Sequence, residues 1–277
     1  MSLNRADRGF ALIELLMGLI LFGLIGGVML RTTLSMERTT HAHLSRLGIE
    51  GSLDTGIDFL SSELASLGRD STGTDLVSQA LDSLSYRAER ATGLACQVTA
   101  TSVRTSIARY AGSRQPQPGR DSLLLYLGED ALLHGPGPWV AAPVLAVRAA
   151  TCGSSPAWDI VTTIDTTRFS LANIAPWTPI RFFEVMQSRL YLSGGATWLG
   201  VRSISAGEVI QPLAGPFTPG RSGFLLRDSA GGVATAPAAT RRILIGLSGA
   251  WTGWPATGLP PGAESTGVTI APGNLQP

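Results

Sequence analysis

Residues 8–30 read RGFALIELLMGLILFGLIGGVML, a basic residue and a glycine followed by a stretch from Phe10 to Leu30 in which only Glu14 is charged. A helix of these roughly 21 residues would span roughly 31 Å at ~1.5 Å per residue. That length matches the ~30 Å hydrocarbon core of a bilayer. The segment therefore predicts a helix that enters a membrane near the N-terminus.

Glu14 is the unusual residue of this helix. A charged side chain inside a membrane helix costs about 2.5–3.5 kcal/mol on insertion scales. Glu14 lies four residues after Phe10, which is about one helical turn. If the chain were cut after Gly9, the new α-amino group of Phe10 would lie one turn from Glu14, or would face the Glu14 of a neighbouring copy. Such a charge pair in an apolar bundle would set the register between helices.

The junction Gly9-Phe10, followed by Glu14 and preceded by a short leader with Arg5 and Arg8, resembles the class III signal of type IV pilins and type II secretion pseudopilins. The resemblance implies that a prepilin peptidase cleaves after Gly9 and methylates the new N-terminal Phe10. It also implies that Glu14, the fifth mature residue, guides docking into the growing filament. The implied partners are other major and minor pilins or pseudopilins, an inner-membrane assembly platform and membrane lipid, and no cofactor is implied.

Two other interpretations of the apolar segment compete with this one. A cleaved secretory signal peptide would need a small-residue cleavage site after a shorter apolar core, whereas residues 27–31, GVMLR, run directly into a polar helical pattern. A plain signal anchor would explain the hydrophobicity and the basic flank, but it would leave Glu14 and the Gly9-Phe10 junction without a role. The filament signal explains all of these features.

Charge predicts both the orientation and the compartment. Arg5 and Arg8 precede the apolar run, and the positive-inside tendency keeps the leader in the cytoplasm. The head is then expected in the periplasm while the chain is an inner-membrane precursor, and in a pilus or pseudopilus after assembly.

The charges of the chain are balanced. All 21 basic residues are arginine, and removing residues 1–9 leaves 19 charges of each sign. This balance gives no general electrostatic attraction to nucleic acid.

Hydrophobic periodicity predicts that the helix continues beyond the membrane. Apolar residues recur at spacings of three and four, the pattern of a helix with one buried face, up to a C-cap at Gly68. These residues are Leu44, Leu47, Leu53, Ile57, Leu60, Leu64 and Leu67. Short β-branched runs separated by Gly and Pro then predict a mainly antiparallel β head. The expected fold is α+β and pilin-like, with a long N-terminal helix packed on that head.

This reading divides the chain into five segments. They are a leader (1–9), a transmembrane half-helix (10–30), an amphipathic half-helix (31–68), a β head (69–254) and an irregular Gly/Pro-rich tail (255–277). The predicted strands are 97–103, 122–127, 140–147, 160–164, 180–185, 189–192, 199–204 and 242–247. Residues 81–98 are predicted to begin as a short helix or strand and to continue into a strand that contains Cys96.

The two cysteines, Cys96 and Cys152, are expected to form a disulfide in an exported domain, with buried free thiols as the alternative. Closing that loop would remove roughly 4 kcal/mol of unfolded-chain entropy. No metal site is predicted. The histidines His41, His43 and His134 have no ligand spacing, and two helical residues two apart do not share a face.

No catalytic motif is recognisable, so the chain is expected not to be an enzyme. The nearest candidate is residues 246–250, GLSGA, which lacks the final glycine of a nucleophile elbow, and no histidine follows it. A turn after the strand 242–247 explains these residues better.

Six tryptophans are expected mainly to pack the β head, although they could instead line a ligand surface. They are Trp139, Trp158, Trp177, Trp198, Trp251 and Trp254.

The size of the head suggests a minor filament component. Residues 57–70, IDFLSSELASLGRD, with Tyr86-Arg87 and Cys96 further on, resemble PilW-type minor pilins and the J-type minor pseudopilin. Glu14 argues against the K-type minor pseudopilin, which usually lacks this glutamate. The expected function is to initiate or cap a type IV filament. The alternatives are a type II secretion minor pseudopilin and a membrane-anchored surface module for adhesion or DNA uptake, and the latter leaves nucleic acid open as a partner.

Overall fold

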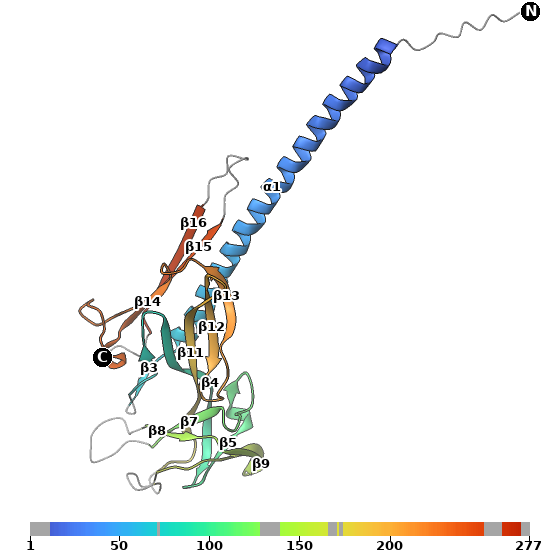
Figure 1. Cartoon of the computed structure of the whole chain (residues 1–277). Coiled ribbons are helices and arrows are strands. Elements are labelled where there is room, and N and C mark those ends of the chain that lie inside the picture. Colours follow the sequence, from blue (N-terminus) through green and yellow to red (C-terminus); the bar gives the residue numbers. More distant parts are fainter. Residues whose placement is uncertain are drawn as a thin grey trace, which may run out of the picture. The chain divides into compact units, whose positions relative to one another are not determined.

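The computed structural model describes residues 12–70, 73–127, 139–165, 171, 174–251 and 262–272 (Figure 1). The chain divides into two compact units. The first contains Met1–Gly48 and Ala250–Ala263, and the second contains Ile49–Gly249 and Glu264–Pro277. In the first unit, Cζ of Arg46 lies 5.5 Å from the centroid of the Trp251 ring, a cation–π distance.

The N-terminal element is one helix, α1, which runs from Leu12 to Ala65. It ends earlier than the sequence predicts, because Gly68 does not adopt the left-handed conformation of a glycine C-cap. The Gly68 N–H instead donates to Oδ2 of Asp75 over 2.8 Å. The Gly68 N–H is therefore bound to a buried carboxylate downstream and does not cap the last carbonyls of the helix.

The buried face of α1 consists of Ile49, Leu53, Gly56, Leu60 and Leu64. Their spacings of four, three, four and four residues match the helical repeat. The predicted stripe is wrong at its start, because Leu44 and Leu47 are 58% and 60% exposed. The buried face of α1 therefore begins at Ile49.

Most of the strands belong to one antiparallel sheet, whose central path is β13-β12-β11-β4-β5-β10-β9. Strands β3 and β6 also pair with β4, and β7 pairs with β11 and β8. In chain order these are β3 (Leu76–Gln79), β4 (Ser83–Val98), β5 (Ser102–Ser106), β6 (Ala111–Gly112), β7 (Asp121–Tyr126), β8 (Trp139–Pro143), β9 (Ala146–Cys152), β10 (Ser155–Val161), β11 (Thr178–Ser193), β12 (Ala196–Ser203) and β13 (Gln211–Phe217).

Two smaller sheets and two short 3₁₀ turns complete the elements of the described residues. A two-stranded sheet pairs β1 (Arg69–Asp70) with β2 (Gly73–Thr74). A three-stranded sheet has the order β14 (Gly223–Arg227), β15 (Arg242–Trp251) and β16 (Gly262–Ile270). The 3₁₀ turns are Ile107–Arg109 and Pro237–Ala239. An α+β architecture with a mainly antiparallel sheet is therefore confirmed.

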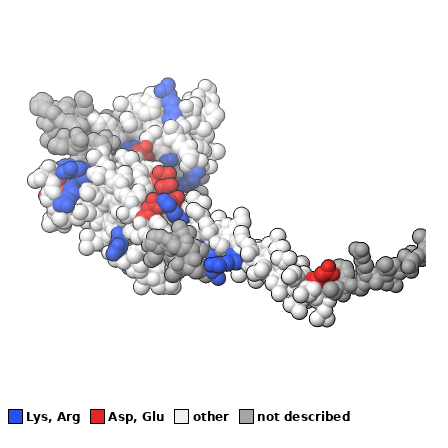
Figure 2. Space-filling model, turned by 90° about the horizontal axis from the view of Figure 1, so that it is seen from above, with Lys and Arg blue, Asp and Glu red and all other residues white. Residues whose placement is uncertain are grey.

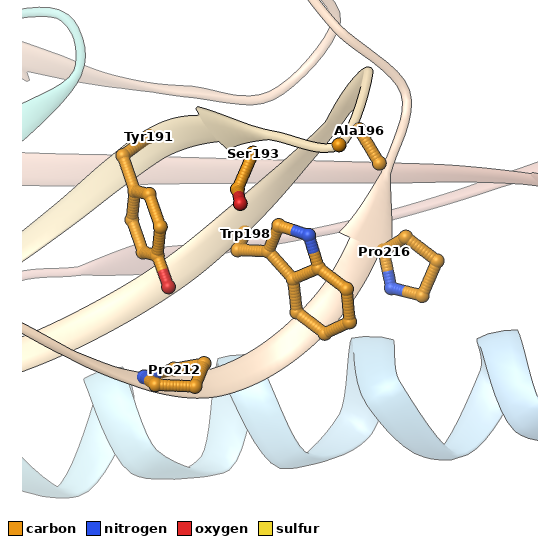
Figure 3. Close-up of a pocket in the computed structure, with 7 residues that line it drawn as sticks. Tyr191, Ser193, Ala196, Trp198, Pro212 and Pro216 are labelled. Carbon is orange, nitrogen blue, oxygen red and sulfur yellow. The ribbon is translucent and has the colours of Figure 1, made fainter.

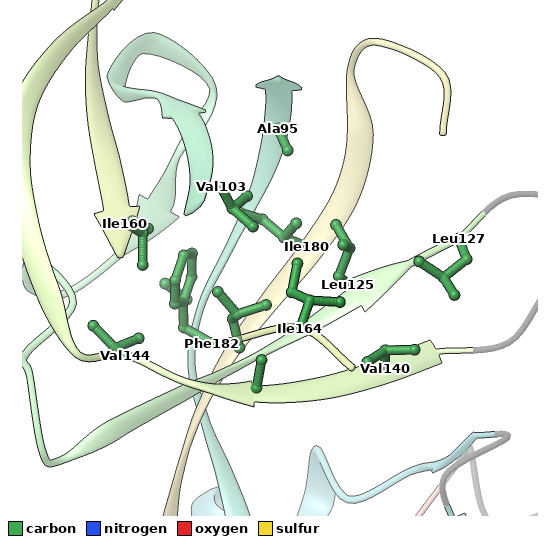
Figure 4. Packing of buried hydrophobic residues seen from close by; sticks show 13 residues of the cluster. Ala95, Val103, Leu125, Leu127, Val140, Val144, Ile160, Ile164, Ile180 and Phe182 are labelled. Carbon is green, nitrogen blue, oxygen red and sulfur yellow. The ribbon is translucent and has the colours of Figure 1, made fainter. Parts of the chain in front are cut away.

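The large sheet curls around an apolar core. Phe182 of β11, Leu125 of β7 and Val103 of β5 are fully buried and belong to one cluster of side chains (Figure 4). Strands β4, β8 and β10 contribute to the same cluster. Because side chains from both wings of the sheet meet there, the sheet encloses its own core at this end.

Around Gly56, helix α1 packs closely on the large sheet and on strand β15 of the three-stranded sheet. A Cβ at this position would lie 2.7 Å from Cδ1 of Leu247 and 3.6 Å from Cβ of Ala214. The Ser52 hydroxyl donates to the carbonyl of Gly215 over 3.0 Å. Glycine at position 56 therefore lets the helix axis lie close to the strands.

Several strand predictions require correction. The predicted strand 97–103 contains the turn between β4 and β5, and the predicted strand 140–147 contains the break between β8 and β9. Segments 180–185 and 189–192 are one strand, β11, and residues 81–98 are mostly strand β4. The predicted turn at 246–250 is strand β15, and the predicted irregular tail contains strand β16.

These differences have a common physical cause. Long strands such as β4 and β11 contain polar and small residues that tertiary pairing holds in the extended conformation against local preference. The strand β16, GAESTGVTI, is rich in turn-forming residues, yet it pairs with β15. Strand β13, which contains a glycine and two prolines, was not predicted for the same reason.

Replacing Leu60 by Ala should lower the free energy of unfolding by about 2–5 kcal/mol, because Leu60 is fully buried between α1 and the sheet. The matched control is Leu47→Ala on the same helix, which should change it by no more than about 0.5 kcal/mol. Denaturant unfolding of the full chain in detergent micelles measures both values. Equal losses in the two variants would contradict the buried face described above.

Candidate functional site

The first part of α1 presents an uninterrupted apolar surface. Every residue from Leu12 to Leu30 is exposed in the isolated chain, and Phe22 is 79% exposed. The 19 residues would span roughly 28 Å, close to the thickness of a bilayer core. Figure 2 shows this part of the helix almost without basic or acidic atoms, apart from one acidic patch. By length and composition, α1 can cross a membrane.

Glu14 is the acidic residue of the first turn of α1 as described. The other two residues of the predicted processing signal, Gly9 and Phe10, lie outside the described residues, as does the leader. The structure therefore places Glu14 at the start of the apolar helix and leaves the cleavage site itself a prediction. Its position fits the spacing on which that prediction depends.

No contact within the described chain requires glycine at four positions of the apolar segment. A Cβ added at Gly18, Gly23, Gly26 or Gly27 would meet no atom within 4 Å. Each glycine inside a helix costs about 1 kcal/mol relative to alanine. Small residues at a spacing of four, such as Gly23 and Gly27, allow two helices to approach closely in lipid. The pattern therefore suits contacts with other helices.

A buried group of charges joins α1 to the sheet. We call it the Glu184 cluster, and its members are Glu63, Arg90, Arg114, Arg120, Asp121, Glu184 and Glu208. The Glu184 side chain is only 2% exposed. Its Oε2 lies 3.0 Å from Nε of Arg90 and 3.4 Å from Nη2 of Arg114, and its Oε1 lies 2.6 Å from Nε of Arg120. Three guanidinium groups therefore surround one carboxylate.

The same cluster reaches the helix and two loops. Arg90 Nη1 donates to Oε1 of Glu63 on α1 over 3.0 Å. Arg114 Nη2 donates to Oδ1 of Asp121 over 2.7 Å, and Arg120 Nη1 donates to Oε1 of Glu208 over 2.8 Å. Charge-assisted bonds of this kind are stronger than neutral ones and impose geometry. The cluster thus fixes α1, β4, β11 and the loops that carry Arg114, Arg120 and Glu208.

A β-bulge contributes the central arginine. Along β4 and β11, Phe182 pairs with Ala91 and Phe183 pairs with Glu89, so Arg90 is the extra residue. A bulge redirects the side chain that it carries. Burial alone lowers the pKa of Arg90, but its hydrogen bonds to Glu63 and Glu184 outweigh that effect and hold the pKa above its ordinary value. Arg90 therefore stays charged.

Asp75 forms a second buried ionic contact. Its Oδ2 lies 3.3 Å from Nη2 of Arg181 and accepts the Gly68 N–H that follows α1. Burial raises the pKa of Asp75, and the charge of Arg181 and the Gly68 N–H offset part of that rise. Arg181 also contacts Glu89, with 2.7 Å between Nε of Arg181 and Oε2 of Glu89. This contact fixes the chain where it leaves the helix.

A disulfide joins Cys96 of β4 to Cys152 of β9, with the two Cα atoms 6.0 Å apart. Strands β5 and β10 lie between β4 and β9 in the sheet order. Three strand spacings in a flat sheet would separate them by roughly 14 Å. The bond therefore joins two strands that only the curl of the sheet brings together. Arg104 of β5, whose Nη1 donates to the Thr151 carbonyl over 3.4 Å, makes a similar contact.

The tryptophans are less buried than the sequence predicts. Trp139, Trp158, Trp198 and Trp251 are half-buried, and Trp177 is exposed with Cζ of Arg109 5.0 Å from its ring centroid. Trp158 packs against the core cluster and makes an edge contact with Tyr110. Trp254 lies outside the described residues. The described tryptophans therefore lie at or near the surface, and Trp158 still packs against the core.

Within the described residues, no group of three His, Cys, Asp or Glu side chains is placed to hold a metal ion. His134 lies outside this part of the chain.

The sequence did not predict the Glu184 cluster, although a signal was present. Glu184 alternates with Phe182 and Met186 on a buried face, where a carboxylate needs a partner.

The chain was also compared with known proteins. No protein-family model, no curated protein and no solved structure matches it. Its function must therefore be argued from its own residues.

Replacing Glu184 by Ala should lower the free energy of unfolding by about 3–5 kcal/mol, because it leaves three partly buried arginines without the buried carboxylate that they share. The control is Asp82→Ala, since the Asp82–Arg189 contact of 3.7 Å is about half exposed on both sides. That change should cost no more than about 1 kcal/mol. Denaturant unfolding compares the two, and a Glu184 loss as small as the control would show that the cluster does not stabilise the fold.

Removing the disulfide should destabilise the chain by roughly 4 kcal/mol on the loop-closure scale, since 56 residues separate its cysteines. The double variant Cys96→Ala with Cys152→Ala removes the bond and leaves no stray thiol. The unfolding midpoint of this variant should not change with dithiothreitol, whereas the unfolding midpoint of the wild type should fall when the disulfide is reduced. A wild type that is indifferent to the reductant would contradict a structural role for the bond.

Proposed function

We propose that this chain is a non-enzymatic subunit of a type IV filament, a minor pilin or pseudopilin that helps to initiate or cap the filament. The observation that carries the proposal is the exposed apolar surface of α1 from Leu12 to Leu30, with Glu14 in its first turn. A monomer in water would not keep so large an apolar surface exposed. The surface suits lipid in the precursor and neighbouring helices in a filament.

The rest of the helix supports the same function. From Ile49 onward α1 is buried on the sheets of the second unit, and Glu63 joins it to Arg90 and, through Arg90, to Glu184. A subunit that assembles through its N-terminal helix needs that helix to be fixed in the head. The buried face and the ionic contact supply this attachment.

The proposed maturation begins with cleavage after Gly9 by a prepilin peptidase and methylation of Phe10. The precursor would be held in the inner membrane with its leader in the cytoplasm and its head in the periplasm. Glu14 would then pair with the N-terminal amino group of its own or a neighbouring subunit and thereby select the register. The Gly23 and Gly27 pair would allow close approach of the helices.

A pseudopilus of type II secretion requires the same helix chemistry, and nothing in the helix separates it from a pilus. Localisation distinguishes them. The N-terminal peptide, isolated from membranes and from sheared surface filaments, is analysed by mass spectrometry. A peptide that begins at N-methylated Phe10 in the sheared fraction supports a pilus, and the same peptide confined to membranes supports a pseudopilus. An intact leader in both fractions would overturn the proposal.

Two substitutions separate processing from assembly. Gly9→Ala should leave an unprocessed precursor, whereas Gly18→Ala inside the apolar segment should be cleaved normally. Glu14→Ala should be cleaved but poorly incorporated, because it lacks the charge that sets the register. The control Glu37→Ala removes a carboxylate from an exposed part of the same helix and should be incorporated like the wild type. Normal incorporation of Glu14→Ala would remove the proposed role of Glu14.

A further inference from the structure

The hairpin of β11 and β12 forms a surface pocket together with the neighbouring strand β13. The pocket has a volume of about 430 Å³, within the range of roughly 300–1,000 Å³ found for ligand sites. Figure 3 shows Tyr191, Ser193 and Trp198 along the hairpin, with Pro212 and Pro216 on β13. All the residues that line the pocket belong to the second unit.

Its two aromatic rings are held by the backbone beneath them. Tyr191 and Trp198 are directly opposite residues of β11 and β12. A Cβ on Gly200 would lie 2.6 Å from a ring carbon of Tyr191, and a Cβ on Gly215 would lie 2.9 Å from a ring carbon of Trp198. Each ring therefore rests on a bare stretch of glycine backbone. Rings fixed in this way lose little conformational freedom when a ligand binds.

The lining has no charged side chain. Its polar side-chain groups are the hydroxyls of Tyr191 and Ser193 and the indole N–H of Trp198, and none of them has a hydrogen-bond partner among the described residues. The indole N–H can only donate, and no carboxylate or amide side chain is present to accept. The pocket therefore suits an uncharged ligand that has flat apolar faces, offers acceptors and brings few donors.

A proline-rich peptide has these properties. Each proline lacks an N–H, and the polyproline II conformation leaves the carbonyls free to accept hydrogen bonds. Aromatic-lined grooves are a general way of recognising such peptides. A sugar ring also stacks on aromatic side chains, but its hydroxyls would bring donors to a lining whose side chains have only two hydroxyl oxygens to accept them.

The strand beside the pocket is unsuited to another mode of peptide binding, in which the peptide adds a strand to the edge of the sheet. β13 is the last strand of the large sheet's central path, and Pro212 and Pro216 remove two of its N–H groups. Prolines on such a strand prevent another strand from adding to it by regular backbone pairing. A peptide at this place must therefore be held by the side chains of the pocket.

We propose that the Tyr191–Trp198 pocket binds a proline-rich segment of a partner protein in the polyproline II conformation. The inference uses only the second unit and does not depend on the proposed filament function. The occupant is defined by its chemistry: an uncharged peptide whose proline rings stack on Tyr191 and Trp198 and whose carbonyls accept the donors of the pocket.

The test uses the full chain in detergent micelles and a dye-labelled decaproline peptide, with binding followed by fluorescence anisotropy. Decaproline should bind at least about tenfold more tightly than a labelled Gly-Ser peptide of equal length. Trp198→Ala should weaken binding at least about tenfold, as expected for an aromatic anchor. The control is Trp177→Ala, which removes an exposed tryptophan outside the pocket and should leave the affinity unchanged.

A second variant guards against misfolding. Tyr191→Phe keeps the ring over Gly200 and removes only the hydroxyl, so it should retain the thermal unfolding midpoint and weaken binding several-fold. The proposal is overturned if decaproline binds no more tightly than the Gly-Ser peptide, or if the affinity is the same in wild type and Trp198→Ala. Binding of cellohexaose in place of decaproline would overturn it in favour of a sugar site.

Discussion

The contact between α1 and the sheets of the second unit is the interaction on which the rest of the structure depends. A helix of this kind has little stability alone, so its conformation from Ile49 to Ala65 rests on burying one face. Leu53, Leu60 and Leu64 supply that burial, and Gly56 allows close approach. Glu63 also orients the helix, because the hydrogen bond that it accepts from Arg90 fixes the rotation of the helix about its axis.

The Glu184 cluster lies on the sheet face that also carries the apolar core. Phe182 packs in that core, and Glu184 follows two residues later on the same face of β11. Charges buried in this way are rarely the most stabilising choice, since desolvation offsets much of the attraction. They demand specific partners, however, and here the partners come from α1, β4 and two loops. The cluster therefore also helps to specify how these elements come together.

The opposite demands on the two parts of α1 connect fold to function. Up to Leu30 the helix exposes apolar side chains and contains glycines that no contact within the described chain requires. From Ile49 the same helix is buried and joined to charged residues. One part is built to meet lipid or other helices, and the other is built to hold a β head. The proposed filament subunit would use both parts.

Much of this organisation was visible in the sequence, because it depends on local pattern. The apolar segment, Glu14, the helical repeat through Leu60 and Leu64, and most strand segments follow from the order of residues along the chain. The start of the buried face, the length of β11 and the strand β16 did not follow, because tertiary pairing overrides weak local preferences. The cysteines suggested a bond, but only the curl of the sheet brings Cys96 and Cys152 together.

The sequence by itself determined that a long apolar helix with one carboxylate precedes a β-rich head, since hydrophobicity and period are properties of neighbouring residues. Tertiary structure alone decided that Glu63, Arg90 and Glu184 meet, and that Tyr191 and Trp198 form a pocket with two prolines. Those arrangements depend on strand register and on a bulge at Arg90. Register is set by contacts between residues far apart in the chain, so no local pattern could have revealed them.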